Sequence, residues 1–380
     1  MSDITLILLG AGSATRFRND TNIEQLPKKQ WLYSGDQPLW LDVVGNFETL
    51  YDFADIVIAA SVEDIAVMKN FASYSYVEGG STRQASLSNA LANIGTEYVL
   101  VSDIARCCLD SKMIGRVIEA KAQADCIVPV LSAVDTIYQE GKPIDREGIK
   151  LIQTPQLSRT KILKKALAQA DEFSDDSSAI ASIGGSVAFV EGSMEAHKLT
   201  RLSDLKKLPC LKPPSKDNFV GFGVDIHPFE ANKKMFLCGV AIESVDYGFK
   251  AHSDGDVAIH ALIDALLGAC GMGDIGELYP DTDSQYENID SKVLLKDTMA
   301  KIRGVGFVPI NVDMTIMAQA PRLLPYKEAM KQSISTLVGI EKRYVNIKAT
   351  TAEKLGFVGR KEGVMVQAVA NVKYFDWSRI

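Results

Sequence analysis

The sequence has few of the features that mark membrane-bound, secreted or nucleic-acid-binding proteins. None of the apolar runs in its 380 residues approaches the roughly 20 residues that a membrane-spanning helix needs. The first such run, Ile4–Leu9, also lacks the basic flank and the length of a signal peptide. The net charge of −7 argues against general affinity for nucleic acid or anionic membranes. We therefore expect a cytoplasmic protein that binds neither, with a small anionic substrate only where basic residues are concentrated.

Cysteine and histidine are also scarce. None of the six cysteines has the C-x-x-C spacing that is typical of metal and redox sites. A chain of this length does not need disulfide bonds to fold, so we expect all six to be buried thiols in a reducing compartment. The chain contains only four histidines, His197, His227, His252 and His260. Three of them fall within one short stretch, which is where histidine chemistry is to be sought.

The composition is that of an ordinary globular protein, with 47% hydrophobic and 23% charged residues. Because domains usually contain about 100–200 residues, we expect two. Three prolines within the six positions 209–214, followed by a polar stretch, can continue neither a helix nor a central strand. We therefore expect a first domain over residues 1–208, a linker over 209–217 and a second domain over 218–380.

Both parts have the pattern of α/β domains. In the first, β-rich runs alternate with helical patterns, which predicts a Rossmann-like domain with a mostly parallel sheet. Its expected strands are Thr5–Leu9, Ile56–Ala60, Tyr98–Val101, Cys126–Val130 and Ser186–Val190. The second part is expected to be a smaller α/β domain. Its expected strands are Phe219–Val224, Asn311–Ala318, Val345–Ala349 and Met365–Lys373, with helices at Asp254–Cys270, Ser291–Gly304 and Pro325–Gly339.

A glycine-rich loop follows the first strand. Residues Gly10–Arg16 contain Gly10 and Gly12, which allow a tight turn whose backbone N–H groups can point at phosphate oxygens. A dinucleotide-binding fingerprint would have a third glycine where Arg16 stands, and a P-loop would have Gly-Lys-Ser/Thr, so neither motif is present. An arginine at that place suits the charge of a pyrophosphate, although an ordinary strand-to-helix turn remains an alternative.

Further donors and cations follow along the first domain. Lys29 comes soon after the loop, Gly79–Ser86 is a second turn rich in donors, and Asp103 and Arg106 follow the strand Tyr98–Val101. The carboxyl ends of strands are where open α/β sheets bind ligands. Any one of these basic residues alone could equally be a solvated surface charge.

Taken in order, these residues resemble the 2-C-methyl-D-erythritol 4-phosphate cytidylyltransferases over nearly the whole first domain. The motifs are Gly12…Arg16, Pro27-x-Lys29-Gln30, Gly79-Gly80-x-x-Arg83-x-x-Ser86, Asp103-x-x-Arg106, Asp135-Thr136, Arg146 and Thr154-Pro155-Gln156, with Ser174 and Lys198 near the end. The sequence departs from the family pattern at Gly10, Ser102, Cys107 and Ser174. Of these, Ser174 keeps the hydroxyl of the usual threonine, and the others concern the shape of loops.

The resemblance implies that methylerythritol phosphate attacks the α-phosphorus of CTP and that pyrophosphate leaves. Arg16 and Lys29 would stabilise the pentacoordinate charge, with Lys198 near the phosphates. Ser86 would contact cytosine and Asp103 the ribose or substrate hydroxyls. Substrate contacts are also implied for Gly12, Gly80, Arg83, Arg106, Thr136, Arg146, Thr154 and Ser174, some of them from a partner subunit's arm. Such catalysis consists mostly of positioning and electrostatics, and Mg²⁺ on the triphosphate is implied.

The second domain contains a candidate metal site. Phe222–His227 has strand character, so Asp225 and His227 point to one face. His260 lies on the following helix, which Ser253 or Asp254 is expected to cap. Three protein ligands with an open fourth position are typical of catalytic zinc. On spacing alone, a core histidine and a turn aspartate are the alternative.

The surrounding residues closely resemble the 2-C-methyl-D-erythritol 2,4-cyclodiphosphate synthases, end to end. The motifs are Asp225-x-His227-x-Phe229, Ala251-His252-Ser253-Asp254-Gly255-Asp256-Val257-Ala258-x-His260, Gly273–Gly276, Tyr279–Asp283, Ala318–Pro321 and Lys348–Phe357. Arg322 and Ala352 depart from the usual lysine and threonine.

This resemblance implies a homotrimer with active sites between subunits, which cyclises CDP-methylerythritol 2-phosphate and releases CMP. Asp225, His227 and His260 would bind Zn²⁺, and Glu353 would bind Mg²⁺ or Mn²⁺. His252, Ser253 and Asp281 would contact the substrate near the attacking phosphate and the polyol. A cytosine pocket is implied at Ala318, Pro321, Leu323, Leu324, Ala349 and Thr350, and Thr351 would also contact the substrate. Phe357 and Arg360 would line a cavity on the trimer axis, or be a core phenylalanine and a surface arginine.

Together the two resemblances imply a bifunctional enzyme of isoprenoid-precursor synthesis. The two reactions are not consecutive, since an ATP-dependent kinase acts between them and the sequence has no kinase-like phosphate loop. We expect that kinase to be a separate chain that associates with this one. A hexamer would satisfy both a dimeric and a trimeric half. The alternative is that only the second domain is active and that the first is a nucleotide-binding or assembly module.

Overall fold

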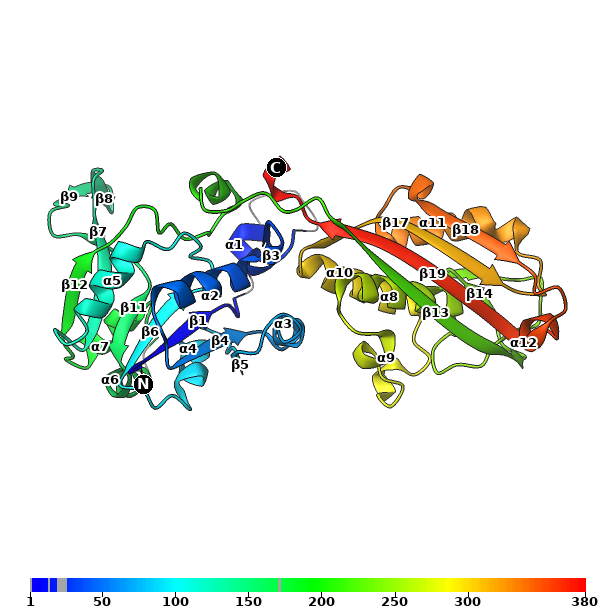
Figure 1. The fold of residues 1–380 in the computed structure, drawn as a ribbon, viewed down its shortest axis with the longest axis horizontal. Helices are drawn as coiled ribbons and strands as arrows, with labels where there is room; N and C mark the ends of the chain where they lie inside the picture. The colour runs from blue at the N-terminus through cyan, green and yellow to red at the C-terminus, as the bar shows by residue number, and fades with distance from the viewer. Residues whose placement is uncertain (1, 13, 19–25, 170–171) are drawn as a thin grey trace. The chain divides into compact units, whose positions relative to one another are not determined.

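The computed structural model describes residues 2–12, 14–18, 26–169 and 172–380. The chain forms two compact units, one ending at Pro213 and the other beginning at Pro214. Figure 1 shows both, with the first unit in blue to green and the second in green to red. None of the helices in the described ranges is long and apolar enough to cross a membrane.

The first unit is built on one eight-stranded sheet. Its order is β10-β7-β11-β6-β1-β4-β5, and β12 pairs with β7. The five strands expected from the sequence are confirmed as β1 (Ile4–Leu9), β4 (Asp55–Ala60), β6 (Tyr98–Asp103), β7 (Cys126–Ser132) and β12 (Val187–Glu191). Three further strands are β5 (Ser75–Glu78), β10 (Lys150–Ile152) and β11 (Gln156–Arg159). The sheet is mostly parallel, but β11 runs antiparallel between β6 and β7.

The helices of the first unit connect these strands. They are α1 (Thr15–Arg18), α2 (Leu39–Leu50), α3 (Val62–Met68), α4 (Arg83–Leu91), α5 (Ser111–Glu119), α6 (Thr160–Leu167) and α7 (Asp176–Ser182), with 3-10 helices η1 (Lys29–Trp31) and η2 (Leu202–Lys207). Two small hairpins are β2 (Tyr33–Ser34) with β3 (Gln37–Pro38), and β8 (Ile137–Gln139) with β9 (Lys142–Ile144). Side chains of α4 and α6, among them Leu87 and Leu163, pack with strand residues Ile7, Val99 and Val128 in the core.

The expectation of six free thiols is wrong, because Cys108 and Cys210 form a disulfide with their Cα atoms 5.5 Å apart. The linker region returns along the first unit, where Lys212 N–H donates to Ser34 Oγ (3.1 Å) and Gly35 N–H donates to Pro213 O (3.2 Å). This path brings together two cysteines that are 102 positions apart, a proximity that local spacing cannot reveal. The other four cysteines are buried thiols, as expected.

The second unit has a five-stranded sheet in the order β16-β13-β19-β17-β18. The four expected strands are confirmed as β13 (Asn218–Ala231), β17 (Phe307–Met317), β18 (Val345–Thr350) and β19 (Gly363–Tyr374); β16 (Tyr247–Phe249) is the fifth. Only β17 and β18 pair in parallel among these described strands. A separate ribbon joins β14 (Phe236–Leu237) to β15 (Val240–Ala241).

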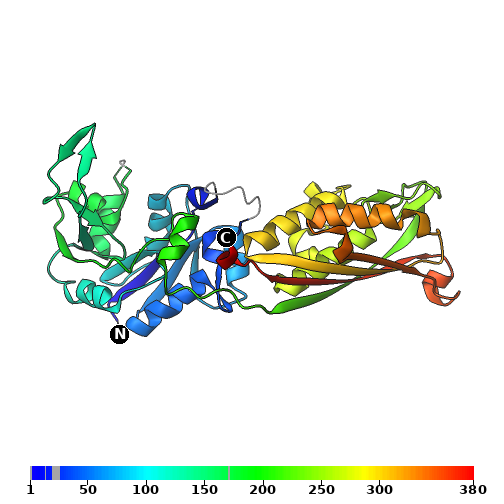
Figure 2. The same cartoon turned by 90° about the horizontal axis from the view of Figure 1, so that it is seen from above.

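The long helices of this unit lie over one face of the sheet, which Figure 2 shows edge-on. The three expected ones are confirmed as α8 (Val257–Cys270), α10 (Ser291–Gly304) and α11 (Lys327–Val338). Short helical turns are α9 (Ile275–Leu278), α12 (Gly356–Gly359), η3 (Ser284–Tyr286), η4 (Leu324–Tyr326), η5 (Lys342–Tyr344) and η6 (Trp377–Arg379).

Two glycines let α8 lie close against β13. A Cβ on Gly221 would stand 1.9 Å from Ala265 O, and one on Gly223 would stand 2.0 Å from Ala261 O. Real Cβ atoms do not approach so closely, so only glycine permits this separation of helix and strand. The close packing brings the side chain of His260 on α8 to the level of Asp225 and His227 on β13.

Candidate active sites

The second unit holds a cluster of three potential metal ligands. Asp225 and His227 alternate with exposed residues along β13 and therefore face α8, which carries His260. Asp225 Oδ2 lies 3.0 Å from His227 Nε2 and 3.2 Å from His260 Nδ1. One ligand atom from each residue lies within 4.8 Å of the others, and no second such cluster occurs in the described ranges.

In each imidazole, the ring nitrogen that faces away from Asp225 lies within hydrogen-bonding distance of a neighbouring oxygen. His227 Nδ1 lies 3.1 Å from Gly255 O, so a proton on Nδ1 leaves Nε2 free to bind a metal. His260 Nε2 lies 2.9 Å from Ser291 Oγ and 3.2 Å from Ser253 Oγ, which leaves Nδ1 facing Asp225. Ser291 in turn donates to Asp254 Oδ1. Such outer partners orient metal-binding histidines in zinc sites.

The arrangement fits a divalent metal better than a closed hydrogen-bond network. Asp225 Oδ2 is buried and has no aligned hydrogen bond among the described residues, although two ring nitrogens lie close to it. Burial raises the pKa of Asp225, but the two imidazoles outweigh it and hold that pKa well below its usual range. Burial lowers the pKa of His227, but Asp225, the Gly255 carbonyl and Asp256 together raise that pKa above its ordinary value. One carboxylate and two imidazoles converging in this way form a donor set suited to zinc.

The helix that carries His260 begins differently from the expectation. Asp256, and neither Ser253 nor Asp254, is the N-cap of α8, and its carboxylate accepts from Ile259 N–H (3.1 Å). The same fully buried carboxylate accepts from the N–H groups of Cys238 and Gly239. Asp256 therefore ties the β14–β15 ribbon to the start of α8, a long-range role that the local capping pattern could not show.

The metal ligands open into a cavity of about 490 Å³. His252, Ser253 and Asp281, which the sequence assigned to the substrate, also line it. Lining residues that the sequence did not assign include Lys250, Asp264, Tyr279 and Tyr286. Asp264 stands four positions after His260 on α8, and its carboxylate accepts from Ile275 N–H (2.8 Å). That helical spacing was the one signal for it in the sequence.

The residues expected to bind cytosine gather elsewhere in the same unit, at the ends of β17 and β18. Ala318 N–H donates to Thr350 O (3.0 Å), Ala320–Pro321 is a cis peptide bond, and Leu323 is buried while Leu324 is exposed. Ala349 and Thr351 flank Thr350, and Thr351 Oγ1 donates to Glu353 Oε1 (2.8 Å). None of these described residues lines the metal cavity of the same chain.

Phe357 and Arg360 lie on and just after α12. Phe357 is half-buried, and the exposed Arg360 forms a two-pronged ion pair with Glu362 (2.8 and 3.0 Å). Their expected place on a trimer axis stays a prediction.

The first unit has a cavity of about 620 Å³ at the carboxyl ends of β1 and β6. Seven of the residues assigned from sequence line it: Gly12, Lys29, Gly80, Arg83, Ser86, Asp103 and Lys198. Thr15 and Thr200 also line it and were not assigned. Arg16 belongs to α1, but its side chain lies outside the described part of the structure.

One close steric contact and a set of hydrogen bonds shape the loops around this cavity. A Cβ on Gly79 would stand 2.1 Å from Ala11 Cβ, so glycine is required where the two glycine-rich loops meet. The buried Asp64 accepts from Lys28 Nζ (2.9 Å), Gln30 Nε2 (3.1 Å) and Trp31 Nε1 (2.8 Å). These bonds hold the segment that carries Lys29.

An ionic cluster extends from this cavity, which Asp103 and Lys198 line, to Thr154 and Arg106. Asp103 Oδ2 accepts from Lys198 Nζ (2.7 Å) and Thr154 Oγ1 (3.3 Å), and Arg106 Nε donates to Thr154 Oγ1 (2.8 Å). Burial raises the pKa of Asp103, but Lys198, Arg83 and Arg106 together keep it below the ordinary value. Arg106 and Lys198 also line an adjoining cavity of about 520 Å³.

Thr136, Arg146 and Ser174 are not brought to this cavity within one chain. Thr136 and Arg146 are exposed beside the β8–β9 hairpin, where Arg146 Nη1 donates to Val134 O. Ser174 is exposed two positions before α7.

Comparisons with known proteins cover the whole chain. The 2-C-methyl-D-erythritol 4-phosphate cytidylyltransferase family matches residues 4–209, and the YgbB family matches residues 219–373. The chain is 65% identical to a bifunctional enzyme IspD/IspF of Sulfurovum sp. over 100% of both chains. It is 54% identical to one of Sulfurimonas denitrificans over 99% of this chain and 96% of the relative.

A solved structure of the same kind is that of the bifunctional IspDF from Campylobacter jejuni. It is 49% identical, covers 100% of both chains and superposes with a TM-score of 0.88. Because the similarity runs through both units, a first unit kept only as a binding or assembly module is not favoured. The chain belongs to the bifunctional IspD/IspF enzymes, with a cytidylyltransferase in its first part and a cyclodiphosphate synthase in its second.

Proposed function

We propose that the cavity of the first unit is the site where methylerythritol phosphate attacks the α-phosphorus of CTP. The convergence of Lys29, Arg83 and Lys198 around a glycine-rich loop carries this proposal. Lys29, with Arg16, stabilises the pentacoordinate phosphorus, and backbone N–H groups near Gly12 and Gly80 receive phosphate oxygens. Mg²⁺ supplies charge neutralisation of the triphosphate when bound.

The polyol substrate occupies the neighbouring part of this site. Arg106, Thr154 and Lys198 form one hydrogen-bonded group with Asp103, which is suited to hold a phosphate and hydroxyls. Ser86 contacts cytosine. Thr136 and Arg146 reach the site from the hairpin of a partner subunit, in keeping with their exposure here. Ser174 completes the substrate contacts.

The matched test uses two lysine variants. Lys29→Ala should abolish pyrophosphate release from CTP and methylerythritol phosphate, yet leave CMP formation by the second unit unchanged. Lys161→Ala, an exposed lysine on α6, should leave both reactions unchanged. Pyrophosphate release at the wild-type rate from Lys29→Ala would refute the assignment of this cavity.

We propose that the cavity of the second unit is where CDP-methylerythritol 2-phosphate cyclises. Asp225, His227 and His260 hold Zn²⁺, which when bound supplies Lewis acidity to the β-phosphate. His252, Ser253 and Asp281 orient the attacking 2-phosphate and the polyol, so that attack on the β-phosphorus expels CMP. Glu353, with its hard carboxylate oxygens, holds a second ion, Mg²⁺ or Mn²⁺. Metal analysis should find about one zinc per chain in active protein.

A homotrimer with sites between subunits explains the separation of the two halves of this site. The metal cavity and the cytosine residues around Thr350 do not share a cavity within one chain. The face of β13 turned away from α8 exposes Val220 (63%), Phe222 (58%), Val224 (38%) and Ile226 (47%), an apolar stripe suited to subunit contact. Phe357 and Arg360 would then line the trimer axis. Phe222→Asp should dissociate the oligomer in sedimentation and lower CMP formation, whereas a wild-type mass would count against the trimer.

Dimeric contacts of the first unit and trimeric contacts of the second would combine in a hexamer. The missing kinase step motivates a further proposal, that the separate kinase associates with this chain in the cytoplasm. Cross-linking at physiological concentration that yields no complex would contradict the association.

A further inference from the structure

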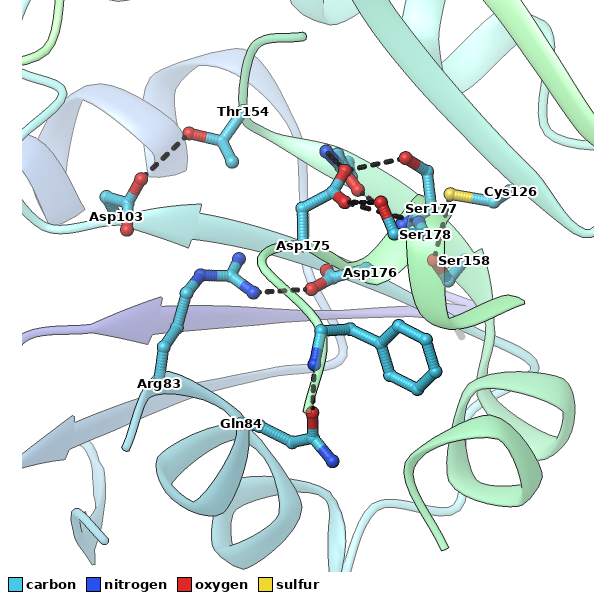
Figure 3. A network of polar contacts seen from close by, with 12 residues as sticks. Arg83, Gln84, Asp103, Cys126, Thr154, Ser158, Asp175, Asp176, Ser177 and Ser178 are labelled. Carbon is cyan, nitrogen blue, oxygen red and sulfur yellow. Dashed lines mark hydrogen bonds and ion pairs between the residues drawn. The ribbon is translucent and has the colours of Figure 1, made fainter. Parts of the chain in front are cut away.

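Arg83 is paired behind the nucleotide cavity with a residue that no motif singled out. Arg83 Nη1 donates to Asp176 Oδ1 (2.8 Å), and the Asp176 side chain is 0% exposed. Arg83 lines the cavity and is 26% exposed, whereas Asp176 does not line it. Figure 3 shows the pair, with Arg83 rising from α4 and Asp176 at the start of α7. The direct contact of Asp176 with the residues lining the cavity is therefore its ion pair with Arg83.

The neighbouring carboxylate, Asp175, has a different role. It accepts from Ser178 N–H (3.2 Å), Ser177 Oγ (2.6 Å) and Gln156 Nε2 (2.9 Å), so it caps α7 and joins it to β11. Asp176 makes none of these bonds, and its Oδ2 is buried without a partner in the described structure. The two adjacent acids therefore have different roles: Asp175 caps α7, and Asp176 forms an ion pair with Arg83.

Burying a charged carboxylate that has a single partner costs free energy, so a functional role is expected for it. Burial indeed raises the pKa of Asp176, and Arg83 only partly offsets this. The second acid near Arg83 is Asp103, whose own partners are Lys198 and Thr154. Without Asp176, the Arg83 guanidinium would be drawn to Asp103 and would compete with Lys198.

We infer that Asp176 is a positioning residue for nucleotide binding: it anchors Arg83 from behind the cavity, so that the guanidinium faces the pyrimidine nucleoside triphosphate and Asp103 stays with Lys198 and Thr154. This inference rests on the proposed CTP site in the first unit. A guanidinium fixed at one nitrogen loses less freedom when it binds an acceptor, so the ion pair prepares Arg83 for its ligand.

The test compares two adjacent acid-to-amide variants in the full chain. Asp176→Asn should raise the KM for CTP about tenfold or more, as expected for a displaced charge-assisted hydrogen bond, and change kcat less. Asp175→Asn should lower the thermal stability of the first unit and leave the KM for CTP near the wild-type value. Asp176→Glu, which keeps the charge, should recover part of the affinity. Equal KM values for both asparagine variants would overturn the inference.

A second comparison decides the matter if Asp176→Asn does not fold. Arg83→Lys keeps the charge but not the fork that can hold an acid and a ligand together, so its KM for CTP should also rise about tenfold. In the Arg83→Lys background, Asp176→Glu should have no further effect on that KM. A wild-type KM for Arg83→Lys, or additive effects in the double variant, would refute the positioning role. If Lys29→Ala still abolishes pyrophosphate release, such a failure concerns Asp176 alone and not the assignment of the cavity.

Discussion

At the scale of single residues, both sites depend on side chains that hold other side chains. The candidate metal ligands Asp225, His227 and His260 were all named from the sequence. Strand alternation and one helical histidine suggested the group, and the family motifs around it favoured a metal site over a core histidine and a turn aspartate. Ser291 was not, since it lies 31 positions after His260 and on another helix. Chain distance hides such partners, and only the packing of α10 against α8 brings Ser291 to the ring.

We predict that Ser291→Ala weakens zinc binding by about 10- to 100-fold, because His260 Nε2 then loses the shorter of its two hydrogen bonds and keeps only the one to Ser253 Oγ (3.2 Å). Competition with a chromogenic chelator measures this affinity without reference to turnover. Thr336→Ala is the matched control, since that exposed hydroxyl bonds only within α11. Equal affinities for the two variants would show that Ser291 does not orient the ligand.

Zinc affinity should fall as the pH falls. The pKa of His227 is raised above its ordinary value of 6.5 by Asp225, and only the neutral ring binds a metal. In the metal-free protein, the His227–Asp225 ion pair stabilises the fold below pH 6.5, and this contribution is lost as the pH rises through the raised pKa. Zinc binding has the opposite pH dependence, because protons compete with the metal for the His227 ring. The increase in Tm that zinc produces should therefore become smaller as the pH falls. Calorimetry with and without zinc across this range checks the sign, and a constant increase contradicts it.

At the scale of elements, the distance between β13 and α8 decides whether the metal ligands meet. The sequence predicted both elements and their faces from periodicity. It did not predict the closeness of their approach, because a glycine in a strand can equally mark a bulge or a bend. The antiparallel β11 was missed for a similar reason: it is short, and its place between β6 and β7 follows from pairing over a long range.

Two glycine substitutions test this packing in opposite directions. Gly223→Ala should lower the free energy of unfolding by about 3 kcal/mol and weaken zinc binding, because the new Cβ forces α8 away from the strand. Gly268→Ala, at an open and exposed position of α8, should raise stability by about 0.5–1 kcal/mol through helix propensity. The zinc-dependent calorimetric transition reports both changes. A stable, zinc-binding Gly223→Ala protein would contradict the argument.

At the scale of the whole chain, the disulfide is a link that sequence patterns did not reveal. The Cys108–Cys210 disulfide closes a long loop and fastens the linker region to the first unit. Its partners have no motif in common, and the expectation of free thiols followed only from chain length and spacing.

We expect Cys210→Ser to lower the stability of the first unit by about 2–4 kcal/mol in the absence of reductant, because the unfolded chain is then no longer constrained. Dithiothreitol should lower the Tm of the wild type to about the Tm of the variant. It should leave the Tm of the variant unchanged. Cys107→Ser, the adjacent free thiol, should keep the sensitivity to reductant. A wild-type Tm that is indifferent to reductant would show that the bond does not form in solution.

The sequence by itself determined the two α/β halves and the identity of both activities, and it named the three candidate metal ligands. Local periodicity and the order of motifs along the chain indicate these features, and both can be read without the tertiary structure. Only the tertiary structure showed that Ser291 contacts His260, that Asp256 ties the β14–β15 ribbon to α8, that Asp176 lies behind Arg83 and that Cys108 forms a disulfide with Cys210. Each is a contact between segments far apart in the chain, and such contacts arise from how elements pack rather than from the residues that flank them.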